Sequence, residues 1–205
     1  MKKIICIILG VILISGIAIV YIFTSDKGEE PQYMPCPVLG DGETMDVEIP
    51  KSMYYGSSAS AMARYYKEEE RCIDAWVNDY GVLVVRLDQD TLEKNYELHH
   101  DELMKILNSK LSKVRKEISY DYSVLTLYVN DETTLDDFLT VMMVTPGNCI
   151  MLKLLQGIPS YEIAVDVVVI YEPTGKEILR LDEKTQMNLN RDDWDRLLES
   201  GRQGN

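Results

Sequence analysis

Residues 134–181 read TLDDFLTVMMVTPGNCIMLKLLQGIPSYEIAVDVVVIYEPTGKEILRL, and this stretch decides the fold. Its second half predicts two paired strands. Residues 161–171 alternate in polarity, which is typical of a strand with one buried face. Pro173-Thr174-Gly175 is a turn sequence, and residues 176–181 return as the hairpin partner. At least one strand pair is therefore antiparallel.

The first half of the same stretch predicts a buried helix. Thr134 opens it, with two aspartates in the first turn, where they favour the helix dipole. Pro146-Gly147 is expected to break or kink the helix, which then resumes over residues 150–155. The run is apolar enough to suggest a second membrane span. The Pro-Gly pair and Lys153 instead favour a helix buried deeply in a globular domain.

Outside this stretch, periodicity predicts an α+β domain. Apolar spacings of three and four indicate helices, and alternation indicates strands. Asp90, with Glu93 three residues on, is the expected N-cap of the clearest helix. The elements expected are strands over 43–49, 82–87 and 118–129, helices over 55–80 and 90–116, and a last helix from Asn190 to Gly201.

The resulting order is β-α-β-α-β-α-β-β-α. We expect one mixed sheet of about four to five strands with helices packed against it. The pattern leaves open whether the helices cover one face of the sheet or both.

The N-terminal segment, residues 4–23, is uncharged and apolar. A helix of this length spans ~30 Å, the thickness of a bilayer core. Lys2 and Lys3 precede the segment, and the positive-inside rule then places residues 1–3 in the cytoplasm and the C-terminal part outside. A cleaved signal peptide with a site near Gly16-Ile17-Ala18 is the alternative. The apolar run continues past that point, which favours a retained, single-pass signal-anchor.

Prolines and glycines punctuate residues 24–42, which predicts a tether between membrane and domain. Residues 43–205 then form one acidic extracytoplasmic domain. The whole chain has a formal net charge of −13. A surface this acidic repels phosphate backbones, so nucleic-acid binding is not expected. The acidity serves solubility or, alternatively, attracts cations or a basic partner.

Four cysteines are present, at positions 6, 36, 72 and 149. Cys6 lies in the apolar segment, and the three outside it cannot all pair within one chain. No Cys-x-x-Cys motif suggests a zinc knuckle or a redox site. Cys36 lies between two prolines of the predicted tether. It is a candidate to link two copies as a homodimer, or it is an idle thiol. The pairing of Cys72 and Cys149 stays open.

The two histidines, His99 and His100, are adjacent and are followed by Asp101-Glu102. Neighbouring helix residues point ~100° apart, so this pair cannot hold a metal ion by itself. His99 falls on the apolar face and is expected to pack there, whereas His100 is expected to be solvated. The sequence Gly56-Ser57-Ser58-Ala59-Ser60 lacks the second glycine of a nucleophile elbow, and its serines suit the start of a helix.

Tyrosine is abundant, with 13 residues against two phenylalanines. The candidates to line a binding surface are Tyr54, Tyr55, Tyr65, Tyr66, Tyr120 and Tyr122. The alternative is that most of them are half-buried packing residues. No glycine-rich phosphate loop or dinucleotide fingerprint is present. The sequence therefore predicts no catalytic residue, no cofactor and no metal ligand.

Two hypotheses for the function follow. The first is a membrane-anchored, extracytoplasmic, non-enzymatic domain that binds a protein partner or assembles a cell-envelope complex. The alternative is an envelope hydrolase, metal-dependent or not, that uses His99 or His100 with nearby carboxylates. A pocket containing a histidine and at least two other polar groups would favour the hydrolase. A histidine packed among Tyr96 and Leu103 would favour the binding domain.

The anchor is tested by fractionating cells that express the chain. We expect the protein to stay in the membrane pellet after washes with high salt and alkaline carbonate, because residues 4–23 prefer lipid to water. Release of the domain into the wash or the medium would contradict a retained anchor.

Overall fold

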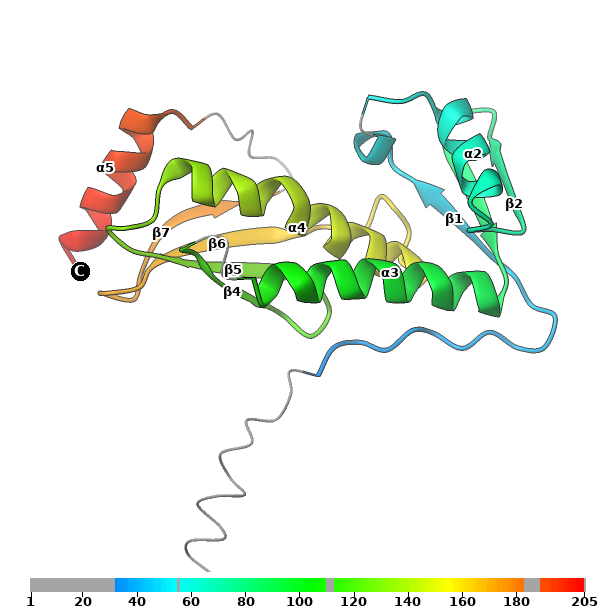
Figure 1. Cartoon of the computed structure of the whole chain (residues 1–205), viewed down its shortest axis with the longest axis horizontal. Coiled ribbons are helices and arrows are strands. Elements are labelled where there is room, and N and C mark those ends of the chain that lie inside the picture. Colours follow the sequence, from blue (N-terminus) through cyan, green and yellow to red (C-terminus); the bar gives the residue numbers. More distant parts are fainter. Residues whose placement is uncertain (1–31, 55, 110–112, 183–188, 205) are drawn as a thin grey trace, which may run out of the picture. The chain divides into compact units, whose positions relative to one another are not determined.

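The structure, a computed structural model, describes residues 32–54, 56–109, 113–182 and 189–204 (Figure 1). The chain divides into two units, residues 1–32 and 33–205, and the second contains all the helices and strands described below. The predicted cytoplasmic residues 1–3, the anchor over 4–23 and residues 24–31 of the predicted tether lie outside the described residues. They remain predictions.

The predicted α+β class is confirmed, but the described strands form two sheets rather than one mixed sheet of four to five strands. The first sheet is antiparallel, with the order β1-β3-β2, and consists of β1 (Met45–Ile49), β2 (Asp74–Val77) and β3 (Leu83–Leu87). The second has the order β4-β5-β6-β7 and consists of β4 (Arg115–Ile118), β5 (Val124–Val129), β6 (Asp166–Tyr171) and β7 (Lys176–Leu181). It is mixed, because β5 and β6 are parallel. The predicted final hairpin is the antiparallel pair β6–β7.

Four α-helices and a short 3-10 helix, η1, complete the described part of the chain. They are η1 (Lys51–Tyr54), α2 (Ala59–Glu68), α3 (Gln89–Leu107), α4 (Leu135–Leu155) and α5 (Arg191–Arg202). Thr134 and Asn190 cap α4 and α5, as predicted. The N-cap of α3 is Asp88 rather than Asp90, because Asp88 and Thr91 bond each other's backbone N–H reciprocally.

The helix predicted over residues 55–80 is wrong in its second half. The helix α2 ends at Glu68, and β2 follows. The charged run 67–71 supplies no apolar side chain for an inward helix face, and Glu70 takes a positive φ of 50°. Ala75, buried in β2 and paired with Val85, lies on the buried face of the first sheet instead.

The prediction of one continuous strand over residues 118–129 is also wrong. The preceding helix, predicted to run to residue 116, ends at Leu107. Residues 115–118 form β4, part of which was predicted as helix, and a tight turn connects β4 to β5. Side chains of Ser119 and Asp121 accept hydrogen bonds from backbone N–H groups inside the turn. Tyr122 adopts a left-handed φ of 58° there. Local side-chain hydrogen bonds thus override the alternating pattern.

The helix α4 continues through Pro146, where a break or kink was expected. A proline in a helix interior costs ~3 kcal/mol. Burial offsets this cost, because residues 151–155 are buried on all sides. Within the described residues, α4 is the one helix with the length and composition to cross a membrane, with a hydropathy of 1.6 over its apolar window. Since 56% of that window is buried inside the protein, it is a core helix, as predicted.

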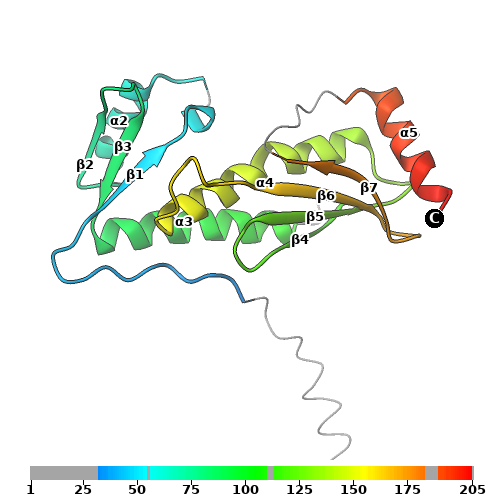
Figure 2. The same ribbon diagram turned by 180° about the vertical axis from the view of Figure 1, so that it is seen from behind.

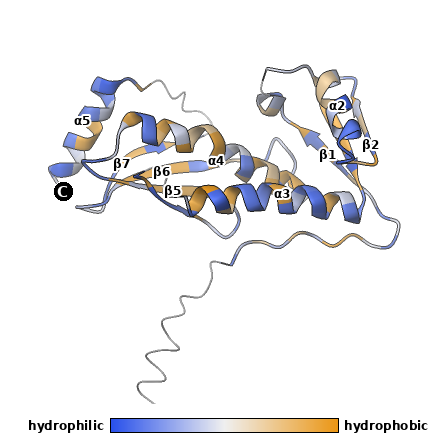
Figure 3. Cartoon of the chain, viewed as in Figure 1, coloured by the Kyte–Doolittle hydropathy of each residue, from blue (hydrophilic) through white to orange (hydrophobic). Residues whose placement is uncertain are grey.

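The apolar core has two parts, and α4 contributes to both. Its N-terminal half, at Phe138 and Val141, packs with the buried face of the second sheet and with α5. Its C-terminal half, from Cys149 to Leu155, packs with the first sheet, α2 and α3. The helices α3 and α4 run side by side (Figures 1 and 2). Figure 3 shows the apolar character of β5 and β6, one face of which supplies this core.

Part of the predicted tether lies on the domain. Residues 33–39 run along α3 and the β4–β5 turn, and Tyr33, Met34, Cys36 and Leu39 pack against the core. The backbone N–H of Met34 donates to the Tyr120 carbonyl over 3.0 Å, and that of Leu39 donates to Gln89 Oε1 over 2.7 Å. Residues 33–39 of the predicted tether are therefore part of the folded domain.

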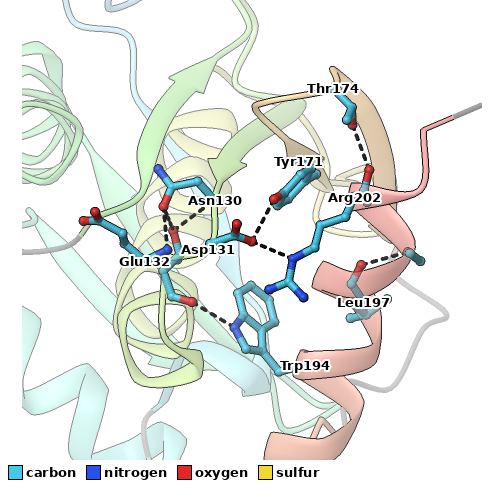
Figure 4. Close-up of polar contacts among 11 residues, drawn as sticks. Asn130, Asp131, Glu132, Tyr171, Thr174, Trp194, Leu197 and Arg202 are labelled. Atoms are coloured by element: carbon cyan, nitrogen blue, oxygen red, sulfur yellow. Dashed lines mark hydrogen bonds and ion pairs between the residues drawn. The ribbon is translucent and has the colours of Figure 1, made fainter.

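Polar contacts hold α5 on the second sheet (Figure 4). The buried Trp194 indole donates to the Thr133 carbonyl over 3.0 Å. Asp131 accepts from the Tyr171 hydroxyl and from the Arg202 guanidinium, at 2.7 and 2.9 Å. Gly201 was predicted to stop the helix but is its penultimate residue. The absence of a side chain at Gly201 leaves room for the Tyr171 ring.

We predict that Gly201→Ala lowers stability. Alanine in a helix is favoured over glycine by ~1 kcal/mol. The added Cβ, however, would lie 2.5 Å from Tyr171 Cγ, and overpacking costs ~1–3 kcal/mol. Thermal unfolding should show a lower Tm for Gly201→Ala, while Glu199→Ala, exposed on the same helix, should stay near wild type. A raised Tm for Gly201→Ala would contradict this close approach.

Candidate functional site

A pocket of about 300 Å³ opens where the first sheet and α2 meet α3 and α4. We call it the Arg71 pocket. Its apolar wall comes from four separate elements, which lie together only in the folded chain. They contribute Ile49 from β1, Met53 from η1, Met62 from α2 and Met151 from α4. A cavity of this size lies at the lower end of the range for small-ligand sites.

Three tyrosines of the predicted binding surface line this pocket: Tyr54, Tyr65 and Tyr66. The Tyr54 hydroxyl donates to the Ile49 carbonyl over 3.1 Å and accepts from the Leu83 N–H over 2.8 Å, so this ring is fixed in place. Tyr65, by contrast, is 41% exposed at the mouth. The other three tyrosines predicted for the binding surface do not line this pocket among the described residues. Tyr122 is fully buried, Tyr120 is exposed in the β4–β5 turn, and Tyr55 lies outside the described residues.

Arg71 supplies a positive charge to the pocket. It follows α2 and is half-buried, and its guanidinium lies over the Tyr65 ring, 5.3 Å from the centroid. Its backbone is anchored, because the Arg71 N–H donates to the Tyr66 carbonyl and its own carbonyl accepts from Asn95 Nδ2. No carboxylate of the described residues lies within the 4.0 Å ion-pair distance of this side chain.

His99 also lines the pocket, held by Asn148 of α4. Asn148 Nδ2 donates to the Val144 carbonyl, which turns Oδ1 toward His99 Nδ1, 2.9 Å away. A carbonyl oxygen only accepts, so His99 Nδ1 carries the hydrogen and Nε2 has the free lone pair. Burial lowers the pKa of His99, and the charge of Arg71 lowers it further, so the imidazole is neutral at pH 7.

His100 is placed differently from the solvated position predicted for it. Its ring stacks on Tyr96 and meets the edge of Tyr33, with ring centroids 6.0 and 5.8 Å apart. Tyr33 belongs to the segment 33–39, so His100 helps to hold that segment on α3. Only one of the two histidines therefore reaches the pocket.

The condition set above for the hydrolase is met. The Arg71 pocket contains a histidine and other polar groups, and Ser57, from the sequence that resembles a nucleophile elbow, lines the same pocket. The catalytic linkage is missing, however. His99 Nε2 is buried and has no hydrogen-bond partner among the described residues. Within the same residues, no group of three or more His, Cys, Asp or Glu side chains could hold a metal ion.

The three cysteines in the described part of the chain are free thiols. Burial, helped by Glu93 and Glu97, raises the pKa of Cys36 to about 11. Burial alone raises the pKa of Cys149 to about 12. Both thiols are therefore protonated at neutral pH and react slowly. The homodimer linked through Cys36 remains a prediction, and it would require this half-buried thiol to become accessible.

Sequence reasoning missed Arg71, Asn148 and the methionine wall of the pocket. Arg71 follows three glutamates and reads as one more charge of an exposed run. In the sequence, Asn148 is only a polar residue that interrupts an apolar helix. Neither position has a motif that could mark it, because His99 comes close to Arg71 and to Asn148 only through tertiary packing.

In comparisons with known proteins, no protein-family model, no curated protein and no solved structure matches this chain.

Proposed function

We propose that this chain is a membrane-anchored, extracytoplasmic, non-enzymatic domain that binds a protein partner through the Arg71 pocket. The partner is engaged directly or as part of a cell-envelope complex. Residues 4–23 are the anchor. The observation that carries the proposal is the pocket itself, with the fixed ring of Tyr54 in its wall and a cation that has no partner carboxylate among the described residues.

The composition of the pocket supports binding. Tyrosine and arginine are the residue types that contribute most to protein interfaces, since they combine large contact area with a polar tip. Methionine adapts its shape to the occupant. Buried residues such as Tyr54 and Met151 form the floor, and the half-exposed Tyr65 forms the rim. A rigid floor loses little conformational entropy when a side chain enters.

The anchor limits where the pocket can work. Between the predicted anchor and the docked residues that begin at Tyr33, residues 24–32 remain. Even fully extended they span at most ~30 Å. A partner would therefore be met close to the membrane surface, as in an envelope complex.

A photo-crosslinking experiment tests this function in the cells that naturally produce the chain. The photoreactive amino acid p-benzoylphenylalanine is placed at position 65 or at position 80. Tyr80 is the control, because it is 87% exposed in a turn away from the pocket. We expect a discrete protein adduct at position 65 and none at position 80. Random collisions would favour the more exposed position 80. Crosslinking at position 80 that equals or exceeds that at position 65 would therefore contradict the proposal.

Hydrolysis is a second candidate function, favoured by one observation: Ser57 and His99 line the same pocket, and Asn148 orients His99. Nε2 would accept the Ser57 proton as the hydroxyl attacks an ester carbonyl, and would pass it to the alcohol that leaves when the ester C–O bond breaks. Water would then hydrolyse the acyl group from Ser57. Purified chain is incubated with p-nitrophenyl esters of graded acyl length. Turnover lost in both Ser57→Ala and His99→Gln but kept in Ser60→Ala, an exposed serine of α2, would establish the enzyme. Equal background rates in all four proteins would exclude it.

A further inference from the structure

The ligand chemistry of the Arg71 pocket follows from its charge. Five arginines in the described part of the chain each pair with at least one carboxylate: Arg86, Arg115, Arg180, Arg196 and Arg202. Arg71 does not, although acidic side chains outnumber basic ones in this chain by 13. Arg64 and Arg191 also have no ion pair among the described residues, but both are exposed, whereas Arg71 is half-buried. A half-buried guanidinium stacked on Tyr65 keeps its fork of N–H donors for another acceptor.

Among the described residues that line the pocket, Arg71 is the one cation. His99 is neutral, because burial lowers the pKa of its imidazole, and its Nδ1–H is already bonded to Asn148. On its other side Arg71 borders a hollow along α3 that also contains acidic side chains such as Asp90 and Glu97. None of these carboxylates lies within 4.0 Å of the Arg71 guanidinium, so none of them forms an ion pair with it.

The walls of the pocket determine the size and the apolar character of the rest of the ligand. The rings of Tyr54 and Tyr66 and the side chains of Ile49 and Met151 are buried and offer apolar contact. The volume of about 300 Å³ equals that of roughly ten water molecules. One aromatic or branched aliphatic side chain fits this space. An aromatic cage for a cationic ligand is the competing interpretation of three tyrosines. Arg71 argues against it, since it already places a positive charge on Tyr65.

We propose that the Arg71 pocket binds a carboxylate carried on a single apolar side-chain-sized body, with the carboxylate on the Arg71 guanidinium and the body between the tyrosine rings. This inference rests on the proposed binding function of the same pocket. The C-terminal residue of a partner polypeptide and a free carboxylic acid both provide this chemistry. Arginine holds a carboxylate through two parallel N–H···O bonds, which an amide of the same shape cannot accept with equal strength.

The test measures binding to the full chain, purified in detergent, by calorimetry against detergent alone. Two matched pairs of probes are used: 4-phenylbutyrate with 4-phenylbutyramide, and acetyl-Gly-Gly-Phe with its C-terminal amide. We expect each acid to bind at least tenfold more tightly than its amide. Tighter binding of the tripeptide acid identifies a polypeptide C-terminus as the source of the carboxylate, and tighter binding of phenylbutyrate identifies a free acid.

Variants separate the charge from the walls. Arg71→Gln should remove the preference for acid over amide, whereas Arg64→Gln, an exposed arginine of α2 outside the pocket, should keep it. Tyr65→Ala should weaken acid and amide alike, because it removes a wall that both use.

Three results would overturn the inference. Equal binding of acid and amide to the wild-type chain would disprove the carboxylate specificity while leaving the pocket a binding site. Preference for phenylbutylamine, the cationic analogue, would establish the aromatic cage instead. No binding of any probe at millimolar concentration would remove the pocket as a site, and the proposed function with it.

Discussion

The burial of α4 in both parts of the core is the constraint on which the rest of the structure depends. A surface helix has one apolar stripe, but α4 contributes its N-terminal half to the core of the second sheet and its C-terminal half to the core of the first. Apolar residues are therefore needed along both halves and, over residues 151–155, around the whole helix, whereas Met143 and Val144 are exposed. This double role also explains why a proline at position 146 is tolerated, since removing one backbone hydrogen bond costs less than exposing either half.

The Arg71 pocket is a consequence of this arrangement. The first sheet, with η1 and α2, meets α3 and α4 around a hollow lined by residues that include Tyr54, Tyr66 and Met151. The same junction holds the polar pair His99–Asn148, one residue from each of the two long helices. A polar contact between packed helices fixes their register, because sliding either helix would leave both side chains buried without a partner.

Electrostatics distinguishes this site from the rest of the surface. The chain is strongly acidic, so an anion is repelled at long range, but salt screens that repulsion beyond about 8 Å. Inside the pocket a single guanidinium stacked on an aromatic ring faces buried apolar walls, where its hydrogen bonds are stronger than in water. Local geometry, rather than net charge, thus decides which ligand the pocket accepts.

Several local features followed from sequence pattern alone. The N-caps Thr134 and Asn190 and the β6–β7 hairpin were predictable, because each depends on residues close together in the chain. The α+β class and the buried nature of the apolar run at 135–155 followed in the same way. The predicted anchor over 4–23 and the outward-facing domain rest on the sequence alone.

Only the tertiary structure decided how many sheets form, which segment packs on which core and where a ligand can enter. Hydrophobic contact is non-directional, so an alternating pattern marks a buried face without naming its partner. The turn at Ser119–Ser123 and the strand at Asp74–Val77 formed because long-range pairing and local hydrogen bonds outweighed intrinsic periodicity. Arg71 and His99 became neighbours for the same reason: packing of distant segments placed them there, and no spacing in the chain encodes that distance.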